Sequence, residues 1–154
     1  MIEFKYIYEN EIGITCFDKY FEYLDGIKTN MPKNIREFAT DKARYTLSGD
    51  LTIHDSWLKA INFEKTFAGE MMVTDVRLGL LQATHKKELW LNYSGATGYS
   101  CSLLPNRWPF KPIDLLTHEF TMLDKGLFKH AVQFDRGVWF EVTFSNFELT
   151  EYSH

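Results

Sequence analysis

The spacing of apolar residues changes at about Gly49. After this residue, short runs of β-branched and aromatic residues alternate with turn residues at intervals of roughly ten, a pattern typical of an antiparallel meander. The runs predict strands over residues 51–53, 57–64, 73–81, 88–94, 99–103, 120–123, 127–134 and 138–144, with a short final strand over 147–152. Turn residues at 124–126 and 135–137 predict two hairpins, which place three C-terminal strands side by side.

The first 49 residues combine a two-residue period with helical periods. Apolar residues at every second position predict a strand over residues 2–8. A stripe at positions i, i+3, i+4 and i+7 begins at Phe17 and predicts a helix that Gly26 can end. A second helix is predicted from Pro32, which the first turn of a helix tolerates, toward Tyr45.

These elements predict an α+β fold with two helices near the N-terminus. The sheet is expected to be mostly antiparallel, and the pattern is compatible with either a rolled or a two-layered meander. The chain has 154 residues, of which 45% are hydrophobic and 25% charged, so a single globular domain over residues 1–154 is predicted. Aromatic residues make up 16% and favour strands, where large rings pack well.

Net charge and cysteine content restrict the partners and the compartment. The net charge of −4 argues against a general nucleic-acid binder, which usually carries a basic surface. Cys16 and Cys101 do not form a CxxC pair, and so few cysteines are typical of a reducing cytoplasm. Polar residues interrupt the N-terminus and every later apolar run, so neither a signal peptide nor a membrane span is expected.

Candidate chemistry is concentrated in the histidines. His54, Asp55 and Ser56 are consecutive, but consecutive strand residues point to alternating faces and cannot form a Ser–His–Asp relay among themselves. A turn or bulge at these residues is the simpler interpretation. His118 and His130 are each in phase with the apolar residues of their strands, so both are expected to face the same packed surface if the strands pair.

A cluster of these histidines is the main catalytic hypothesis. If His54 joins His118 and His130, a His/Asp pocket with Asp55 becomes possible, and these four residues are the candidate catalytic residues. Ordinary half-buried histidines are the simpler interpretation. The sequence contains no HExxH, no paired CxxC and no phosphate-binding glycine motif, so neither a metal nor a cofactor is predicted.

A proline-rich segment supplies candidate binding residues. Three of the four prolines lie within residues 105–112, which predicts a stiff loop because proline fixes φ and removes a backbone donor. Arg107, Trp108 and Phe110 lie in this loop, and aromatic and arginine anchors dominate many interfaces. The structural alternative is a tryptophan that folds back over the end of the sheet.

Charge is distributed unevenly along the chain. Residues 28–44 carry five lysines and arginines against two acidic residues, whereas residues 137–154 carry three glutamates and no lysine or arginine. An acidic sheet edge can steer a basic protein partner, and a basic helix can contact phosphate. Solvated surfaces explain both patterns more simply.

Two segments carry a resemblance to known proteins. Leu51–Asp55, near the start of the meander, and Gly126–His130, near a terminal hairpin, resemble segments of small uncharacterised bacterial β-rich domains, some of which are similar to immunity-type proteins. The resemblance covers about the last two-thirds of the chain and leaves out the helical N-terminal third. It implies an intracellular bacterial protein that binds and neutralises a partner, and it transfers no catalytic residues.

A protein-binding module is therefore the first functional hypothesis. The alternative is a small-ligand-binding protein or a hydrolytic enzyme with a His/Asp pocket. A nucleic-acid contact through the basic residues of 28–44 ranks third, and it would weaken steeply with added salt. The sequence leaves the oligomeric state and the presence of catalytic activity open.

The loop hypothesis predicts that Trp108→Ala weakens binding of a protein partner, because an aromatic anchor is lost. The free energy of unfolding is expected to change by less than about 0.5 kcal/mol, as for a surface substitution. Pull-down and denaturant unfolding of the same variant measure the two quantities. Unchanged partner binding would remove the loop from the interface.

Overall fold

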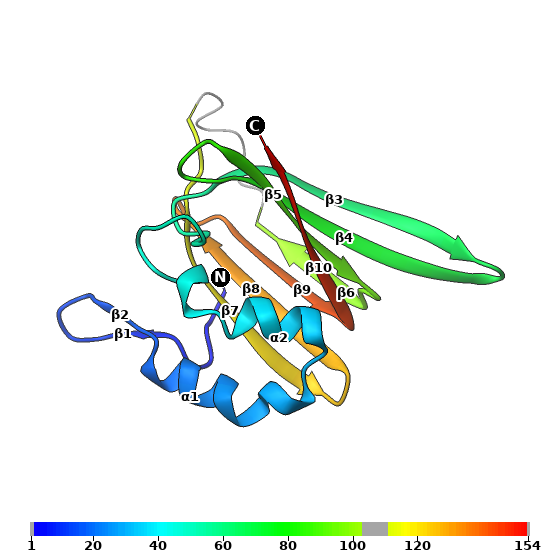
Figure 1. Ribbon diagram of the computed structural model, residues 1–154, viewed down its shortest axis with the longest axis horizontal. Helices are drawn as coiled ribbons and strands as arrows, with labels where there is room; N and C mark the ends of the chain where they lie inside the picture. The colour runs from blue at the N-terminus through cyan, green and yellow to red at the C-terminus, as the bar shows by residue number, and fades with distance from the viewer. Residues whose placement is uncertain (1, 103–110, 154) are drawn as a thin grey trace.

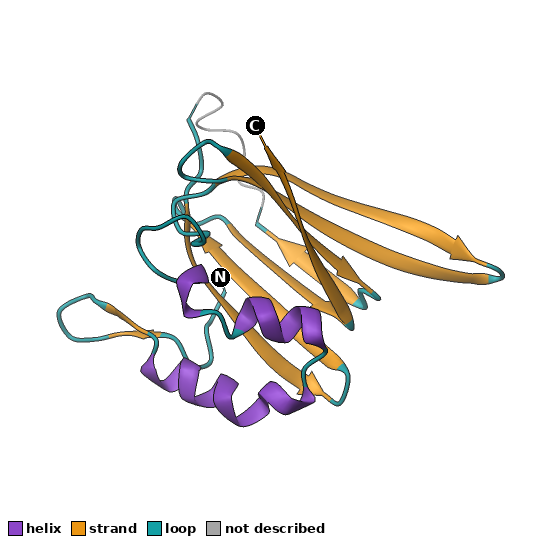
Figure 2. Cartoon of the chain, in the orientation of Figure 1, coloured by secondary structure: helices purple, strands orange, loops and turns teal. Residues whose placement is uncertain are grey.

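The computed structural model describes residues 2–102 and 111–153, which form two four-stranded antiparallel sheets, a small hairpin and two α-helices (Figure 1). The α+β class and the N-terminal position of the helices are confirmed (Figure 2). The N-terminal elements are β1 (Tyr8–Glu9), β2 (Thr15–Cys16), α1 (Asp18–Ile27), α2 (Lys33–Ala39) and two 3₁₀ turns, Lys28–Asn30 and Lys42–Arg44. The strands of the two large sheets are β3 (Trp57–Ala68), β4 (Met71–Leu81), β5 (Lys87–Ser94), β6 (Gly98–Cys101), β7 (Leu115–Asp124), β8 (Leu127–Phe134), β9 (Trp139–Phe144) and β10 (Asn146–Ser153).

The last strand connects the two sheets. The first sheet has the order β10-β5-β4-β3 and the second has the order β6-β9-β8-β7. The hairpins predicted at residues 124–126 and 135–137 are confirmed, because β7 pairs with β8 and β8 pairs with β9. The chain then leaves β9 in the second sheet and pairs β10 with β5 in the first.

The core lies between the inner faces of the two sheets. Residues of β5 alternate between buried and partly exposed, and Leu89, Leu91 and Tyr93 are all 0% exposed. The centroid of the Tyr93 ring lies 5.0 Å from that of Phe144 and 5.9 Å from that of Phe140, both on β9. The two-residue period seen in the sequence therefore becomes one apolar layer shared by both sheets.

Helix α1 satisfies backbone donors at the edge of the second sheet. β7 is an edge strand, and such strands present unpaired N–H groups. The hydroxyl of Tyr20 accepts from the N–H of Phe120 at 2.8 Å, and the hydroxyl of Tyr23 accepts from the N–H of Met122 at the same distance. Two tyrosines one helical turn apart thus attach α1 along β7.

The Tyr20 hydroxyl also continues a hydrogen-bond chain into the core. The hydroxyl of Tyr45 donates to the carbonyl of Ala39 at 2.6 Å, because a carbonyl can only accept. The Tyr20 hydroxyl, 2.8 Å from that of Tyr45, therefore donates to it while accepting from Phe120. Burial raises the pKa of both tyrosines, so the phenols stay protonated and each keeps its donor.

The strand predicted over residues 2–8 is wrong for residues 2–7. A buried carboxylate takes the backbone donors that a strand would use: Glu119 accepts from the N–H groups of Lys5, Tyr6 and Ile7 at 2.8–2.9 Å. Glu119 lies on β7 and is only 2% exposed, so the N-terminal segment covers it. Only Tyr8 of the predicted strand is in β1.

The second helix is shorter than predicted. It ends at Ala39, and the next residue, Thr40, turns its hydroxyl back to the carbonyl of Arg36 at 2.6 Å. The Asp41 carboxylate then accepts from the N–H of Ala43 at 3.1 Å, which begins a 3₁₀ turn in place of a further α-helical turn.

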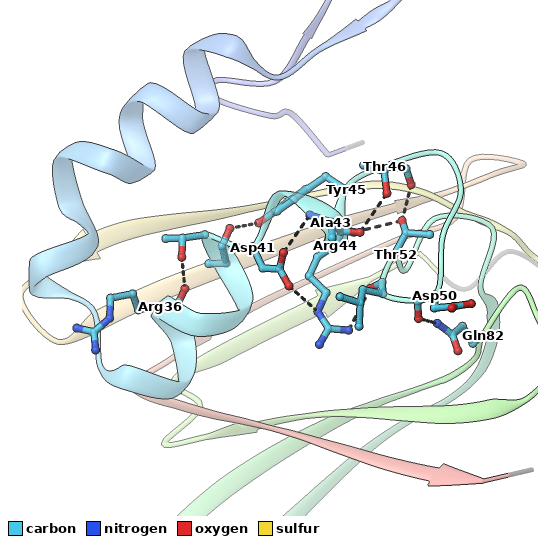
Figure 3. Close-up of polar contacts among 12 residues, drawn as sticks. Arg36, Asp41, Ala43, Arg44, Tyr45, Thr46, Asp50, Thr52 and Gln82 are labelled. Atoms are coloured by element: carbon cyan, nitrogen blue, oxygen red, sulfur yellow. Dashed lines mark hydrogen bonds and ion pairs between the residues drawn. The ribbon is translucent and has the colours of Figure 1, made fainter.

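The strand predicted over residues 51–53 is also wrong. This segment is bonded to the 3₁₀ turn and the residues that follow it, as Figure 3 shows. The guanidinium of Arg44 donates to the carbonyl of Leu51 at 3.0 Å, and the hydroxyl of Thr52 donates to the carbonyl of Thr46. The N–H of Ile53 donates to the carbonyl of Arg44 at 3.3 Å, so the segment is bonded to this turn in place of a neighbouring strand.

The helices in the described part of the chain are all too short or too polar to cross a membrane.

The Tyr20 chain predicts a measurable loss of stability for Tyr20→Phe. The substitution leaves the N–H of Phe120 without its acceptor in a buried position, which costs about 1–3 kcal/mol in the free energy of unfolding. Tyr152→Phe is the matched control, because Tyr152 is 51% exposed. Urea unfolding measures both variants. A Tyr20→Phe variant as stable as the wild type would contradict the role given to this hydroxyl.

Candidate functional site

The structure brings two of the four candidate catalytic residues into contact. His118 on β7 and His130 on β8 lie in a row of buried polar groups that begins on β5. The hydroxyl of Tyr93 is 2.6 Å from His130 Nδ1, and His130 Nε2 is 3.0 Å from His118 Nδ1. The row ends where His118 Nε2 lies 3.1 Å from the carbonyl oxygen of Arg44.

The carbonyl at the end of the row determines which ring nitrogen of each histidine carries a proton. The Arg44 carbonyl can only accept, so His118 carries its proton on Nε2 and leaves Nδ1 as an acceptor. His130 Nε2–H must then donate to His118, which leaves His130 Nδ1 to accept from the hydroxyl of Tyr93. Both imidazoles are neutral and carry the proton on Nε2.

Burial maintains the neutral state of both rings. Desolvation lowers the pKa of His118 to about 3, and the same cause places the pKa of His130 well below its ordinary value. The Phe120 ring stacks on His130 at 3.8 Å between centroids, and the Tyr45 ring stacks on His118 at 4.2 Å. With exposures of 1% and 0%, the two imidazoles have no open face toward a substrate.

The other two candidate catalytic residues make separate contacts. His54 Nδ1 donates to the carbonyl of Leu116 at 2.7 Å, and His54 Nε2 lies 3.2 Å from a carboxylate oxygen of Asp55. Asp55 has φ of 61°, the left-handed conformation that a turn residue adopts. This geometry agrees with the turn interpretation of the His54–Asp55–Ser56 string.

No metal site joins these residues. Among residues 2–102 and 111–153, no group of three or more His, Cys, Asp or Glu side chains is placed to hold a metal ion. The predicted binding residues Arg107, Trp108 and Phe110 lie outside the described residues, so their role stays a prediction.

The acidic C-terminal surface is partly neutralised by lysines. Glu141 lies 3.8 Å from Lys129, and Glu151 lies 3.4 Å from Lys87. Exposed ion pairs of this kind contribute little to stability, but they reduce the negative field over β9 and β10. The acidic edge expected from the sequence is therefore weaker than the residue count suggests.

Several exposed apolar side chains lie on a projecting hairpin. β3 and β4 pair along their whole length, up to Ala68 opposite Met71, whereas β5 pairs with β4 only from Val76 onward. Residues 64–75, here called the arm, therefore extend beyond the rest of the sheet, as Figure 1 shows.

The arm continues the inner face of its sheet without a facing sheet. Phe67 lies opposite Met72, and Phe63 at the base of the arm lies opposite Val76, so all four share one face. Val76 is 0% exposed, whereas Phe63, Phe67 and Met72 are 58%, 75% and 51% exposed. Met71, on the other face of the tip, is 72% exposed.

The arm was not predicted because both predicted strands end too early. Predicted strands over residues 57–64 and 73–81 leave 65–72 as a loop, but β3 and β4 continue to a turn at Gly69, whose φ is 66°. Alternation of Phe63, Lys65 and Phe67 just before this glycine is the signal for a longer hairpin.

Comparison with family models, with curated proteins and with solved structures found no match for this chain. Its function is therefore inferred from the arrangement of its own residues.

The neutral histidines predict that stability falls in mild acid. In the unfolded chain both imidazoles bind protons below about pH 6.5, whereas in the folded chain their lowered pKa values keep them neutral, so acid favours unfolding. Two such groups give a loss of about 2–3 kcal/mol in the free energy of unfolding between about pH 7.5 and pH 5.5.

Denaturant unfolding across this interval measures the loss, because most carboxylates stay ionised throughout it. His85→Asn is the matched control: His85 is exposed, and asparagine tolerates its left-handed φ of 58°. The control should show the same pH dependence as the wild type. A free energy of unfolding that does not change over the interval would contradict the buried neutral pair.

Proposed function

We propose that this chain is a protein-binding module whose partner docks on the arm. The observation that carries the proposal is the exposure of Phe63, Phe67 and Met72 at 51–75% on one face of the β3–β4 hairpin, whose projecting part no other described strand supports. Large contiguous apolar surfaces are rare on monomers and commonly mark interaction sites. A hairpin of two strands gains little stability alone, so the arm gains order when a partner covers it.

The backbone of the arm offers a second mode of contact. β3 is the outermost strand of its sheet, and from Lys59 to Ala68 its outer edge faces no other described strand. Such an edge can accept an additional strand from another protein, with backbone hydrogen bonds giving affinity and side chains giving specificity. The arm can thus combine an apolar face with an open edge.

The charges of the arm favour a partner with a basic rim. Glu64, Glu70 and Asp75 are acidic, and Lys65 is the one basic residue among positions 64–75. Opposite charge around an apolar contact speeds association and selects the partner. The partner that fits best has an apolar pocket bordered by lysine or arginine.

The resemblance of residues 51–55 and 126–130 to small uncharacterised bacterial domains, some of which are similar to immunity-type proteins, favours a partner inside a bacterial cell, one that the chain binds and neutralises. Cys16 and Cys101 are free thiols, which a reducing cytoplasm maintains. The alternative of a hydrolytic enzyme or ligand-binding protein built on His54, Asp55, His118 and His130 receives no support from the geometry, because His118 and His130 are sealed under aromatic rings.

The proposal predicts that Phe67→Ser combined with Met72→Ser abolishes partner capture. Both side chains are exposed, so the folded state should persist while the apolar face is removed. The matched control combines Leu123→Ser with Tyr152→Ser, which removes two other exposed apolar side chains, each 51% exposed. Each tagged protein is incubated with lysate of the organism that encodes the chain at low and high salt, and retained proteins are quantified by mass spectrometry.

The expected result is one stoichiometric partner that the wild type and the control retain and the arm variant loses by about tenfold or more, as for the loss of interface hot spots. Equal retention by the arm variant would contradict the proposal. So would the recovery of no stoichiometric partner at either salt concentration.

A further inference from the structure

A groove of about 640 Å³ lies on the N-terminal part of the molecule. Its walls are the end of the β1–β2 hairpin, the start of α1 and the residues that follow the Lys42–Arg44 turn. Small-molecule sites commonly have volumes of roughly 300–1,000 Å³ and are mostly apolar with a few polar groups.

Three aromatic rings form the floor of the groove. The ring centroid of Phe17 lies 5.7 Å from that of Phe21 and 5.9 Å from that of Tyr45, and the Phe21 and Tyr45 centroids are 5.4 Å apart. The Tyr45 hydroxyl is bonded to the carbonyl of Ala39, which occupies its polar end (Figure 3). These three residues therefore present the apolar carbon atoms of their rings to the groove.

Two exposed aliphatic side chains stand at the lips of the groove. Leu47 is 77% exposed and Ile14 is 55% exposed, although both line an apolar surface. Exposure of apolar surface to water is unfavourable by roughly 25 cal/mol per Å². A ligand that covers both residues therefore binds with a more favourable free energy.

The Leu47 wall is held in place before any ligand binds. The Thr46 hydroxyl lies 3.1 Å from the carbonyl oxygen of Ala43 and 2.9 Å from that of Ser48, and one of the two accepts its proton. The Thr52 hydroxyl donates to the carbonyl of Thr46 (Figure 3). A wall fixed in this way reduces the entropy that binding would otherwise remove.

The Ile14 wall is fixed in the same manner. The side-chain oxygen of Asn10 accepts from the N–H groups of Ile12 and Ile14 at 3.1 and 2.9 Å, and Gly13 supplies the positive φ that the turn needs. Both lips are thus parts of hydrogen-bonded turns.

Lys42 brings one positive charge to this apolar surface. Its ammonium lies 5.2 Å from the centroid of the Phe21 ring, and no carboxylate of the described residues is within 4.0 Å of it. Asp18, Glu22 and Asp25 line an adjoining hollow with Lys42, and the Asp25 carboxylate is bonded to Lys28 at 2.6 Å. Lys42 forms no ion pair with any of the three, so its ammonium can pair with an anion from outside the chain.

We propose that this groove binds a small amphipathic acid, a molecule with an alkyl or aromatic skeleton and a single carboxylate. The apolar skeleton lies on the rings of Phe17, Phe21 and Tyr45 between the two lips, and the carboxylate pairs with Lys42. This site is independent of the arm, since it shares no residue with positions 64–75.

Octanoate, 1-octanol and octylammonium test the proposal, because they share one alkyl chain and differ in head-group charge. Binding to the full chain is measured by isothermal titration calorimetry at concentrations below micelle formation. Octanoate is expected to bind with one-to-one stoichiometry and about tenfold more tightly than octanol, since a charge-assisted hydrogen bond to Lys42 is added. Octylammonium should bind more weakly than octanol.

Three variants assign the binding to the groove. Leu47→Glu should weaken octanoate binding by about tenfold or more, because it removes a lip and adds repulsion. Lys42→Met keeps an unbranched side chain over Phe21 and should reduce octanoate affinity to that of octanol. Leu123→Glu is the control at a remote exposed leucine and should bind octanoate as the wild type does.

Absence of saturable octanoate binding to the wild type would overturn the proposal, as would an unchanged affinity in Leu47→Glu. Equal affinity of the wild type for octanoate and octanol would overturn the assignment of an acid. Retention of the preference for octanoate in Lys42→Met would remove Lys42 from the site.

Discussion

The structure depends on a directional row of buried hydrogen bonds from Tyr93 through His130 and His118 to the carbonyl of Arg44. Tyr93 belongs to the first sheet, the histidines belong to the second, and Arg44 belongs to the helical N-terminal part. Each donor in the row has one acceptor at 2.6–3.1 Å, so displacement of any of the three parts would leave a buried polar group unpaired. The row therefore fixes how the three parts fit together, and this structural role is sufficient to account for the two buried histidines.

Both candidate binding surfaces follow from this arrangement. The Tyr45 ring lies flat on His118 inside the core and also forms part of the floor of the groove, so the row that ends at Arg44 positions that floor. The arm projects away from the core, because it begins where β5 stops pairing with β4. Near its base the N–H of Ala96 donates to the carbonyl of Thr74 at 2.9 Å, and the Phe63 ring just before the arm lies 5.4 Å from the ring of Tyr99. A rigid groove and a projecting arm thus offer two separate surfaces to other molecules.

The local pattern of apolar residues correctly predicted the parts of the fold in which neighbouring residues determine the secondary structure. The strand Leu127–Phe134 was predicted with its observed bounds, and the shared phase of the apolar residues with His118 and His130 indicated that the two rings would face one surface. The prediction from local pattern was wrong where the conformation of a segment depends on a residue distant in sequence. Residues 2–7 alternate like a strand, but their backbone donors are taken by Glu119, more than a hundred residues away. The arm was missed for a related reason, because its exposure depends on where β5 ends and not on the arm's own sequence.

The central claim, that a neutral histidine pair with fixed protons holds the sheets and the N-terminal part together, is tested most directly by the tautomers of the two rings. Long-range ¹⁵N–¹H correlation spectra of the protein labelled with ¹⁵N-histidine distinguish a protonated from an unprotonated ring nitrogen. The expected result at neutral pH is that His118 and His130 both carry a proton on Nε2 and none on Nδ1, and that both remain neutral at about pH 5.5, where an ordinary imidazole is mostly charged. A proton on Nδ1 of either ring, or a charged ring at neutral pH, would contradict the claim.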